Sequence, residues 1–287
     1  MIPNAKTCLY PKDPPQAVSL LQEHGKRALI LAGGTTAALS HDPEVEVLID
    51  ISRMGCDAIE PQGGGWRVGC NVRLQRIASH AGLAGLWGGV LSQAAAAVGS
   101  RPIRNAVTLG GNLVQIFRWS DTPVALLAMG ARLELLGPRG PRSVGADEFY
   151  ARHPRQVLEP AELLVAVQAA SPVGKAGGAF IKYARTAVDL AVADAAACLR
   201  VEGGRCVEAR LAIGATRALP WRASEAEALL TGQALTPARL GEAAALARKA
   251  CKPVGDARTD KAYRERMVEV VARRALERAV ANLQERA

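Results

Sequence analysis

Two short segments with adjacent glycines are the residues best suited to contact a ligand. Ala32–Thr36 follows the strand-like run Ala28–Leu31, and Thr108–Asn112 lies much further along the chain. Glycine has no Cβ, so its amide groups can come close to a flat or charged molecule and point outward together. The Thr108 hydroxyl and the Asn112 amide add hydrogen-bonding groups beside the second pair. The two segments together predict two sides of a site for a phosphate-bearing cofactor.

The motifs alone leave a second interpretation open. Most adjacent glycines form ordinary turns, so two tight turns in a packed α/β domain explain the same residues. Neither segment has the Gly-x-Gly-x-x-Gly pattern of dinucleotide-binding folds or the pattern of a phosphate-binding P-loop. The usual nucleotide-binding folds are therefore not indicated.

As a pair, the two segments resemble those of the FAD-binding medium subunits of the molybdenum hydroxylases. This family includes the carbon monoxide dehydrogenase flavoprotein, the xanthine dehydrogenase FAD subunit and the 4-hydroxybenzoyl-CoA reductase β subunit. The resemblance covers nearly the whole chain, and its motifs are specific as a set. It implies that both glycine segments bind FAD without a covalent bond.

The resemblance also implies roles for residues outside the glycine segments. Asp121 matches an aspartate of the family's flavin site, although it also fits a helix N-cap. Lys182 matches a lysine that reaches back towards the flavin, whereas a lone lysine would ordinarily be solvated at a strand edge. Leu163 or Leu164 matches an apolar residue on the cofactor, which core packing explains equally well. The expected cofactor-binding residues are Ala32, Gly33, Gly34, Thr35, Thr36, Thr108, Gly110, Gly111, Asn112, Asp121, Leu164 and Lys182.

The segment Gln115–Trp119 departs from the family, which usually has small residues there, often Ala-Ser-Pro. Trp119 either stacks on the flavin ring or, with Phe117, anchors the loop to a partner subunit. Arg118 either stabilises a reduced, anionic flavin or faces the solvent. Bulky and cationic groups at this point are expected to change access to the ring.

Composition and spacing exclude several other classes. The net charge of +9 permits nucleic-acid binding, but the basic residues are scattered and form no stripe with interleaved aromatics. No apolar run is long enough to span a bilayer and no signal-peptide pattern is present, so we expect a cytoplasmic protein without a membrane span. The six cysteines and four histidines lack metal-ligand spacing, which predicts free thiols and no metal. With no catalytic triad apparent, the flavin is expected to supply the chemistry.

The expected fold class is α+β. A helix that begins after Asp13 and the strands Ala28–Leu31 and Val45–Ile49 predict a β-α-β-like unit. The resemblance implies a p-cresol methylhydroxylase-type FAD-binding fold with two α/β subdomains. A predicted hinge at Gly174–Gly178 then leads to a smaller C-terminal domain of antiparallel strands and helices, the first of these helices running from Trp221 to Leu230. The expected domains are 1–173, which binds FAD and comprises subdomains of about 1–55 and 56–173, and 174–287, which resembles the CO dehydrogenase flavoprotein C-terminal domain.

The resulting hypothesis is an FAD-carrying electron-transfer subunit of a molybdopterin-dependent hydroxylase, dehydrogenase or reductase. Its expected partners are a large molybdopterin subunit and a small subunit with [2Fe-2S] clusters, in a heterotrimer that pairs into a dimer of heterotrimers. Electrons would pass between the clusters and an external carrier such as NAD, a quinone or ferredoxin. Two alternatives stay open: a stand-alone flavin oxidoreductase of the same fold, and an assembly subunit that has lost FAD.

Overall fold

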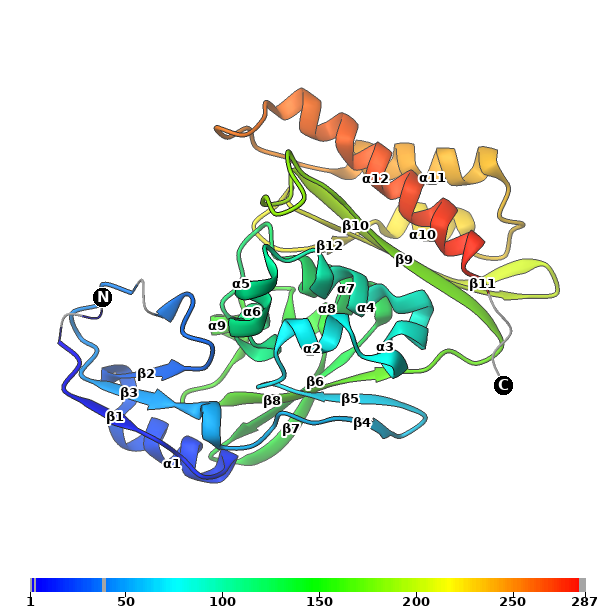
Figure 1. The fold of residues 1–287 in the computed structure, drawn as a ribbon. Helices are drawn as coiled ribbons and strands as arrows, with labels where there is room; N and C mark the ends of the chain where they lie inside the picture. The colour runs from blue at the N-terminus through cyan, green and yellow to red at the C-terminus, as the bar shows by residue number, and fades with distance from the viewer. Residues whose placement is uncertain (1, 3, 38–39, 284–287) are drawn as a thin grey trace. The chain divides into compact units, whose positions relative to one another are not determined.

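The computed structural model describes residues 2, 4–37 and 40–283, which form two compact units of interleaved segments (Figure 1). Unit 1 comprises Met1–Arg76, Arg101–Ile116 and Arg132–Ala169. Unit 2 comprises Ile77–Ser100, Phe117–Ala131 and Ala170–Ala287. The chain thus leaves unit 1 twice, for short helical segments, before its C-terminal part completes unit 2.

Unit 1 begins with the expected β-α-β arrangement, a parallel sheet in the order β1-β3-β2. Its strands are β1 (Thr7–Leu9), β2 (Ala28–Leu31) and β3 (Val47–Asp50). Helix α1 (Pro14–His24) lies between β1 and β2 in the chain, and the Asp13 side chain caps it by accepting the Gln16 N–H at 2.8 Å. The first glycine segment therefore directly follows the edge strand β2.

A second sheet in unit 1 has five strands in the order β4-β5-β8-β6-β7. These strands are β4 (Ile59–Gln62), β5 (Gly65–Gly69), β6 (Arg132–Gly137), β7 (Gly140–Gly145) and β8 (Leu163–Ala170). Helix α5 (Arg101–Ala106) precedes the second glycine segment, which lies at the start of helix α6 (Leu109–Val114) with Thr108 as its N-cap. This segment is thus the start of a helix rather than an open loop.

Unit 2 is built on an antiparallel sheet in the order β12-β11-β10-β9. The strands are β9 (Lys175–Tyr183), β10 (Ala193–Glu202), β11 (Arg205–Gly214) and β12 (Trp221–Arg222). Helices α10 (Ser224–Leu230), α11 (Pro237–Ala250) and α12 (Lys261–Ala281) cover one face, as Figure 1 shows. Helices α4 (Val90–Ala96) and α7 (Asp121–Met129) also pack against the sheet. The expected C-terminal sheet with helices is confirmed.

Alternation along β10 sorts its side chains between the two faces. Ala193, Ala195 and Ala197 are buried in the core formed with α10, α11 and α12. Asp194 points the other way, where a Cβ added at Gly214 would lie 2.1 Å from its Oδ1 and 2.6 Å from Val124 of α7. A carboxyl group is thereby enclosed between the sheet and α7.

Two expectations about the C-terminal part are wrong. Gly174–Gly178 is not a hinge, because Lys175 onward belongs to β9. A Cβ at Gly177 would lie 2.4 Å from the Ala279 carbonyl of α12, so this glycine serves close packing rather than flexibility. The expected helix from Trp221 to Leu230 is instead the short strand β12 followed by α10.

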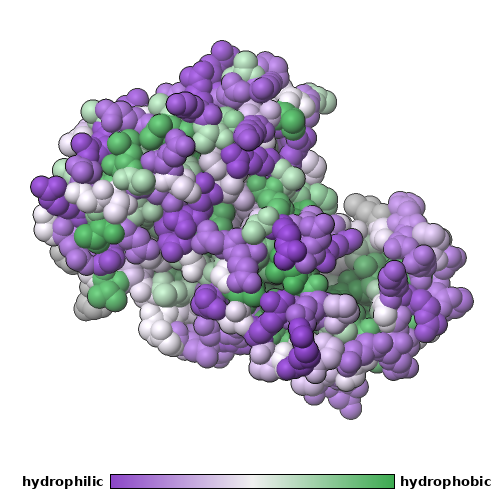
Figure 2. Space-filling view, turned by 180° about the vertical axis from the view of Figure 1, so that it is seen from behind, coloured by the Kyte–Doolittle hydropathy of each residue, from purple (hydrophilic) through white to green (hydrophobic). Residues whose placement is uncertain are grey.

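No helix in the described part of the chain is long and apolar enough to cross a membrane. Figure 2 shows hydrophilic residues interspersed with small apolar patches on the face that it presents. All six cysteines are free, and no group of three or more potential ligands within residues 2, 4–37 and 40–283 could hold a metal ion.

Candidate functional site

The first glycine segment lies against the chain just before the second. A Cβ at Gly33 would lie 2.1 Å from the carbonyl oxygen of Ala106, the last residue of α5. Only glycine permits this approach without moving the backbone, so the segment after β2 and the turn before Thr108 form one continuous wall in unit 1. Within the described part of the chain, the amide N–H groups of Gly33 and Gly34 have no acceptor. Unpaired backbone donors on adjacent residues are what a phosphate-binding site requires.

The other residues of the first segment differ in accessibility. Ala32, Gly34 and Thr36 are half-buried, and Thr35 is exposed. Gly34 has a φ of 73°, a left-handed conformation that glycine adopts readily. The segment therefore combines accessible backbone with two hydroxyl side chains.

The second glycine segment uses its amides differently from what the motif predicts. The Gly110 N–H donates to the Cys70 carbonyl at 2.8 Å, and the Gly111 N–H donates to the Thr108 hydroxyl at 3.1 Å. Thr108 is buried and is the N-cap of α6, and its carbonyl accepts the Asn112 N–H at 3.0 Å. The expectation that the Gly110 and Gly111 amides are available to phosphates is therefore wrong, because the fold already uses both.

At Gly110 the missing Cβ serves close packing. A Cβ there would lie 2.8 Å from the Cβ of Cys70 and 3.1 Å from its carbonyl oxygen. Asn112 is half-buried at the surface of the same short helix. What this segment offers a ligand is a bare backbone surface and an amide side chain.

Arg73 is a residue of this region that the motifs do not reveal. Its Nη1 hydrogen-bonds to the Ala106 carbonyl and would lie 3.1 Å from a Cβ at Gly33. The Arg73 backbone also forms an antiparallel bridge with Thr108. A guanidinium group therefore lies where the two segments meet. No sequence signal marks it, since its partners are far away in the chain.

A cavity of about 390 Å³ lies within unit 1 beside the second glycine segment. Gly110, Cys70, Ile30 and the predicted residue Leu164 are among its lining residues. Leu163 and Leu164 are the first residues of β8 and are nearly completely buried. The cavity wall is mostly apolar with a few polar groups, as expected of a cofactor site.

In unit 2 the predicted residues Asp121 and Lys182 form an ion pair. Lys182 Nζ of β9 lies 3.0 Å from Asp121 Oδ2 and 2.9 Å from the Ala97 carbonyl. The interpretation of Lys182 as a solvated lysine is wrong, since its side chain is only 10% exposed. Asp121 is not the N-cap of α7 either, because Ser120 holds that position and Asp121 is the first helical residue.

Asp194 adds a second carboxyl group to this pair. Asp194 is fully buried, and no cation among the described residues forms an ion pair with it. Burial raises the pKa of Asp121 to about 6 against the opposing effect of Lys182, and burial next to Asp121 raises the pKa of Asp194 well above its usual range. Two adjacent buried carboxyl groups cannot both ionise, so a proton shared between them makes the group of three electrically neutral.

The segment Gln115–Trp119, which departs from the family, makes contacts of its own. Phe117 and Trp119 stack in parallel, with ring centroids 5.5 Å apart, and the Arg258 guanidinium lies 5.1 Å from the Trp119 ring centroid. Phe117 remains 39% exposed. Stacking between the two aromatic residues is a third arrangement, beyond the two that the sequence suggests.

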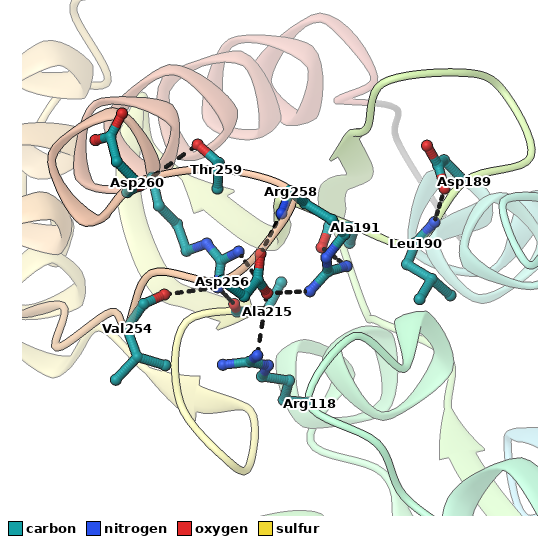
Figure 3. A network of polar contacts seen from close by, with 11 residues as sticks. Arg118, Asp189, Leu190, Ala191, Ala215, Val254, Asp256, Arg258, Thr259 and Asp260 are labelled. Atoms are coloured by element: carbon teal, nitrogen blue, oxygen red, sulfur yellow. Dashed lines mark hydrogen bonds and ion pairs between the residues drawn. The ribbon is translucent and has the colours of Figure 1, made fainter.

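Arg118 is only partly exposed, and its charge is already paired with a carboxylate of this chain. Figure 3 shows it in a network centred on Asp256, whose Oδ2 lies 3.0 Å from Arg118, 2.7 Å from Arg258 and 2.9 Å from the fully buried Arg264. Hydrogen bonds from Arg258 and Arg264 hold the pKa of Asp256 well below its usual range. Neither interpretation of Arg118 from the sequence anticipated this distant partner.

Comparison with known protein families gives two adjoining matches. A model described as the FAD binding domain in molybdopterin dehydrogenase matches residues 4–169. A model described as the CO dehydrogenase flavoprotein C-terminal domain matches residues 178–279. The two together cover nearly all of the chain.

Individual relatives agree with these matches. The carbon monoxide dehydrogenase medium chain of Afipia carboxidovorans is 32% identical over 98% of this chain and 99% of its own. A putative xanthine dehydrogenase FAD-binding subunit of Escherichia coli K12 is 28% identical over 92% of each chain.

Solved structures show the same likeness in three dimensions. A chain of carbon monoxide dehydrogenase from Hydrogenophaga pseudoflava, in a form that lacks the Mo-pyranopterin moiety of its cofactor, superposes with a TM-score of 0.92 at 30% identity, over 99% of this chain and 100% of that one. A chain of quinoline 2-oxidoreductase from Pseudomonas putida 86 gives a TM-score of 0.88 at 28% identity, over 98% of both chains. The likeness thus extends along the whole length of the chain.

Proposed function

Because this chain belongs to the family of FAD-binding subunits of molybdopterin dehydrogenases, we propose that it is the electron-transfer flavoprotein of a molybdenum hydroxylase-type complex. The observation that carries the proposal is the contact of Gly33 with the Ala106 carbonyl, which joins the two glycine segments into one wall. An ordinary pair of turns would not require a glycine at that contact. A wall with accessible backbone donors suits a dinucleotide.

The residues present fit FAD, and each has a definable part in holding it. Gly33 and Gly34 offer amide donors for the pyrophosphate, and Arg73 adds positive charge beside them. Gly110 and Asn112 offer bare backbone and an amide side chain, and Leu164 offers apolar surface in the neighbouring cavity. When bound, FAD supplies the redox chemistry, since it can exchange one or two electrons.

Asp121 and Lys182 remain proposed cofactor residues of unit 2. The group of Asp121, Lys182 and Asp194 is electrically neutral, which supports a particular role. Asp121 and the Ala97 carbonyl hold the lysine in place, and the lysine adds no net charge to its surroundings. A fixed donor of this kind orients a polar ligand atom with little reorganisation.

The finer features of the proposal concern partners and electron flow. We infer a large molybdopterin subunit and a small [2Fe-2S] subunit, in a dimer of heterotrimers, because full-length relatives are named as medium chains or FAD-binding subunits. Electrons would pass between the iron–sulfur clusters and NAD, a quinone or ferredoxin. A cytoplasmic location stays a prediction from the sequence.

Two measurements on native material test this function. The absorption spectrum of the purified chain should show flavin bands, and FAD should be released by denaturation, because no covalent attachment is proposed. A flavin-free spectrum would favour the assembly-subunit alternative. Native mass spectrometry should detect iron–sulfur and molybdenum subunits, whereas a lone flavin-bearing chain would favour the stand-alone oxidoreductase.

A further inference from the structure

Two cysteines from different parts of unit 1 lie together beneath the second glycine segment. Cys56 follows the helical turn after β3, and Cys70 follows β5. The backbone brings them together: the Cys56 carbonyl accepts the Asn71 N–H at 2.8 Å and would lie 2.1 Å from a Cβ at Gly69. Without the glycine at position 69, the two cysteines would be kept apart.

Further contacts hold this pair in place. The Asn71 side chain donates to the carbonyls of Ile51 and Gly55 at 2.6 and 2.8 Å, which ties the segment before Cys56 to the residue after Cys70. Cys56 itself has a φ of 60°, a conformation that residues other than glycine rarely adopt. Such strain persists only where surrounding contacts impose it, and it is found often at functional sites.

The two thiols differ in the way that a reactive pair requires. Cys56 is half-buried, and the neighbouring Cys70 thiol, together with the nearby charge of Arg67, lowers its pKa to about 7. Cys70 is buried, and its contact with Cys56 and its burial raise its pKa. An accessible thiol with thiolate character next to a protonated one is the arrangement of redox-active cysteine pairs.

We propose that Cys56 and Cys70 form a peroxide-oxidisable dithiol, with Cys56 as the attacking residue and Cys70 as the resolving residue. The Cys56 thiolate attacks one oxygen of a hydroperoxide, the O–O bond breaks, and Cys56 becomes a sulfenic acid while the leaving oxygen departs as water or an alcohol. The Cys70 sulfur then attacks the Cys56 sulfur, and the sulfenic hydroxyl leaves as water with the remaining proton. Two thiols are oxidised by two electrons to one disulfide, and one peroxide is reduced.

Formation of the disulfide should also affect the second glycine segment, because the backbone of Cys70 is hydrogen-bonded to it. The Cys70 carbonyl accepts the Gly110 N–H, and Cys70 and Gly110 line the same cavity. Drawing the two sulfurs to bonding distance moves Cys70, which weakens the hydrogen bond that positions Gly110. This consequence rests on the proposed function: oxidation should raise the dissociation constant for FAD about tenfold, as the loss of one hydrogen bond would.

Peptide mapping of the purified full-length chain tests the dithiol directly. Trypsin cleaves after Arg53, Arg67 and Arg73, so the two cysteines fall in separate peptides, 54–67 and 68–73. After stepwise addition of hydrogen peroxide and alkylation with N-ethylmaleimide, the two peptides should appear linked and should separate on reduction. Cys56→Ser should abolish the link, and Cys8→Ser, at another half-buried cysteine, should preserve it.

The outcomes separate the two parts of the inference. Oxidation of Cys56 to sulfinic acid without the link, or a Cys56 that stays alkylatable while Cys8 is oxidised, overturns the dithiol. In Cys70→Ala, a sulfenic acid at Cys56 trapped by dimedone supports Cys56 as the attacking residue, and its absence contradicts that assignment. Equal FAD dissociation constants for the reduced and linked forms overturn the coupling alone, whereas a chain that never binds FAD counts against the proposed function and leaves the dithiol standing.

Discussion

Unit 1 and unit 2 place their polar groups in opposite ways. Unit 1 presents backbone, because glycines at positions 33 and 110 let two segments approach neighbouring main chain without side chains between them. Unit 2 instead buries charged side chains, Asp121, Lys182 and Asp194, between its sheet and α7. Uncharged backbone is exposed at little electrostatic cost, whereas buried charges must be compensated. The two units should therefore respond very differently to substitution and to pH.

The largest effect is expected from the glycine contact in unit 1. Gly33→Ala places a Cβ 2.1 Å from the Ala106 carbonyl, so the wall must open and FAD should be lost completely. The added strain should lower the unfolding free energy by about 1–3 kcal/mol. Flavin absorbance after gel filtration measures the first effect, and urea unfolding measures the second.

Gly145→Ala is the matched control for this substitution. Gly145 also belongs to unit 1, but a Cβ there meets nothing within 4 Å and its φ of −72° suits any residue. This variant should keep its flavin. Equal flavin content in the two variants would show that the Gly33 contact is not part of the site.

The ion pair of unit 2 should give the next largest effect. Lys182→Met leaves Asp121 without its cation in a buried place, which should lower the unfolding free energy by about 3–5 kcal/mol. Lys175→Met changes an exposed lysine on the same strand and should have little effect. Similar denaturation midpoints for both variants would mean that Lys182 is not held as the structure shows.

The shared proton of unit 2 predicts that the unfolding free energy depends on pH. The folded state raises the pKa of Asp121 from 3.8 to about 6 and that of Asp194 well above 3.8, so it binds more protons than the unfolded state. Stability from these groups is therefore present at low pH and is lost as pH rises through about 6. The unfolding free energy should decline by about 1–2 kcal/mol between pH 5 and pH 8 as a result.

Asp194→Asn isolates this contribution. The amide cannot ionise, so the part of the decline that comes from the raised pKa of Asp194 should be lost and the decline above pH 6 should become shallower. Asp256 and Glu162, whose pKa values the fold lowers, act only at lower pH and do not confuse the comparison. Parallel pH profiles for wild type and variant would contradict the shared proton.

The smallest effect is expected at Arg118, where charge is partly exposed and already balanced. Arg118→Met removes one of three arginines around Asp256, which should cost about 1 kcal/mol or less. Since Asp256 neutralises Arg118, the reduction potential of the flavin should stay close to the wild-type value. A clear fall in that potential would revive the interpretation that Arg118 stabilises reduced flavin.

The sequence reveals the features of this molecule that are local. The strand Ala28–Leu31 was predicted with its observed bounds, because an apolar run, a preceding helix stop and a following glycine pair lie within a few residues. The cap at Asp13 is local in the same sense. The glycine segments are found for this reason too, although their partners Ala106 and Cys70 are not.

What the sequence hides depends on residues that only the fold brings together. Asp194 reads as one polar residue in an apolar strand, and nothing nearby points to Asp121. Arg73 and Asp256 are likewise ordinary charged residues until the tertiary structure supplies their partners. Glycines in a strand were mistaken for a hinge because the carbonyl of Ala279, which requires one of them, lies a hundred residues further on.

A crystal structure of the chain purified with its flavin tests the proposed FAD site most directly. We expect the pyrophosphate of FAD against the amide nitrogens of Gly33 and Gly34, with Arg73 nearby and the backbone of Gly110 on the opposite side. FAD bound elsewhere, with the wall of Gly33 and Ala106 free of cofactor, would contradict it.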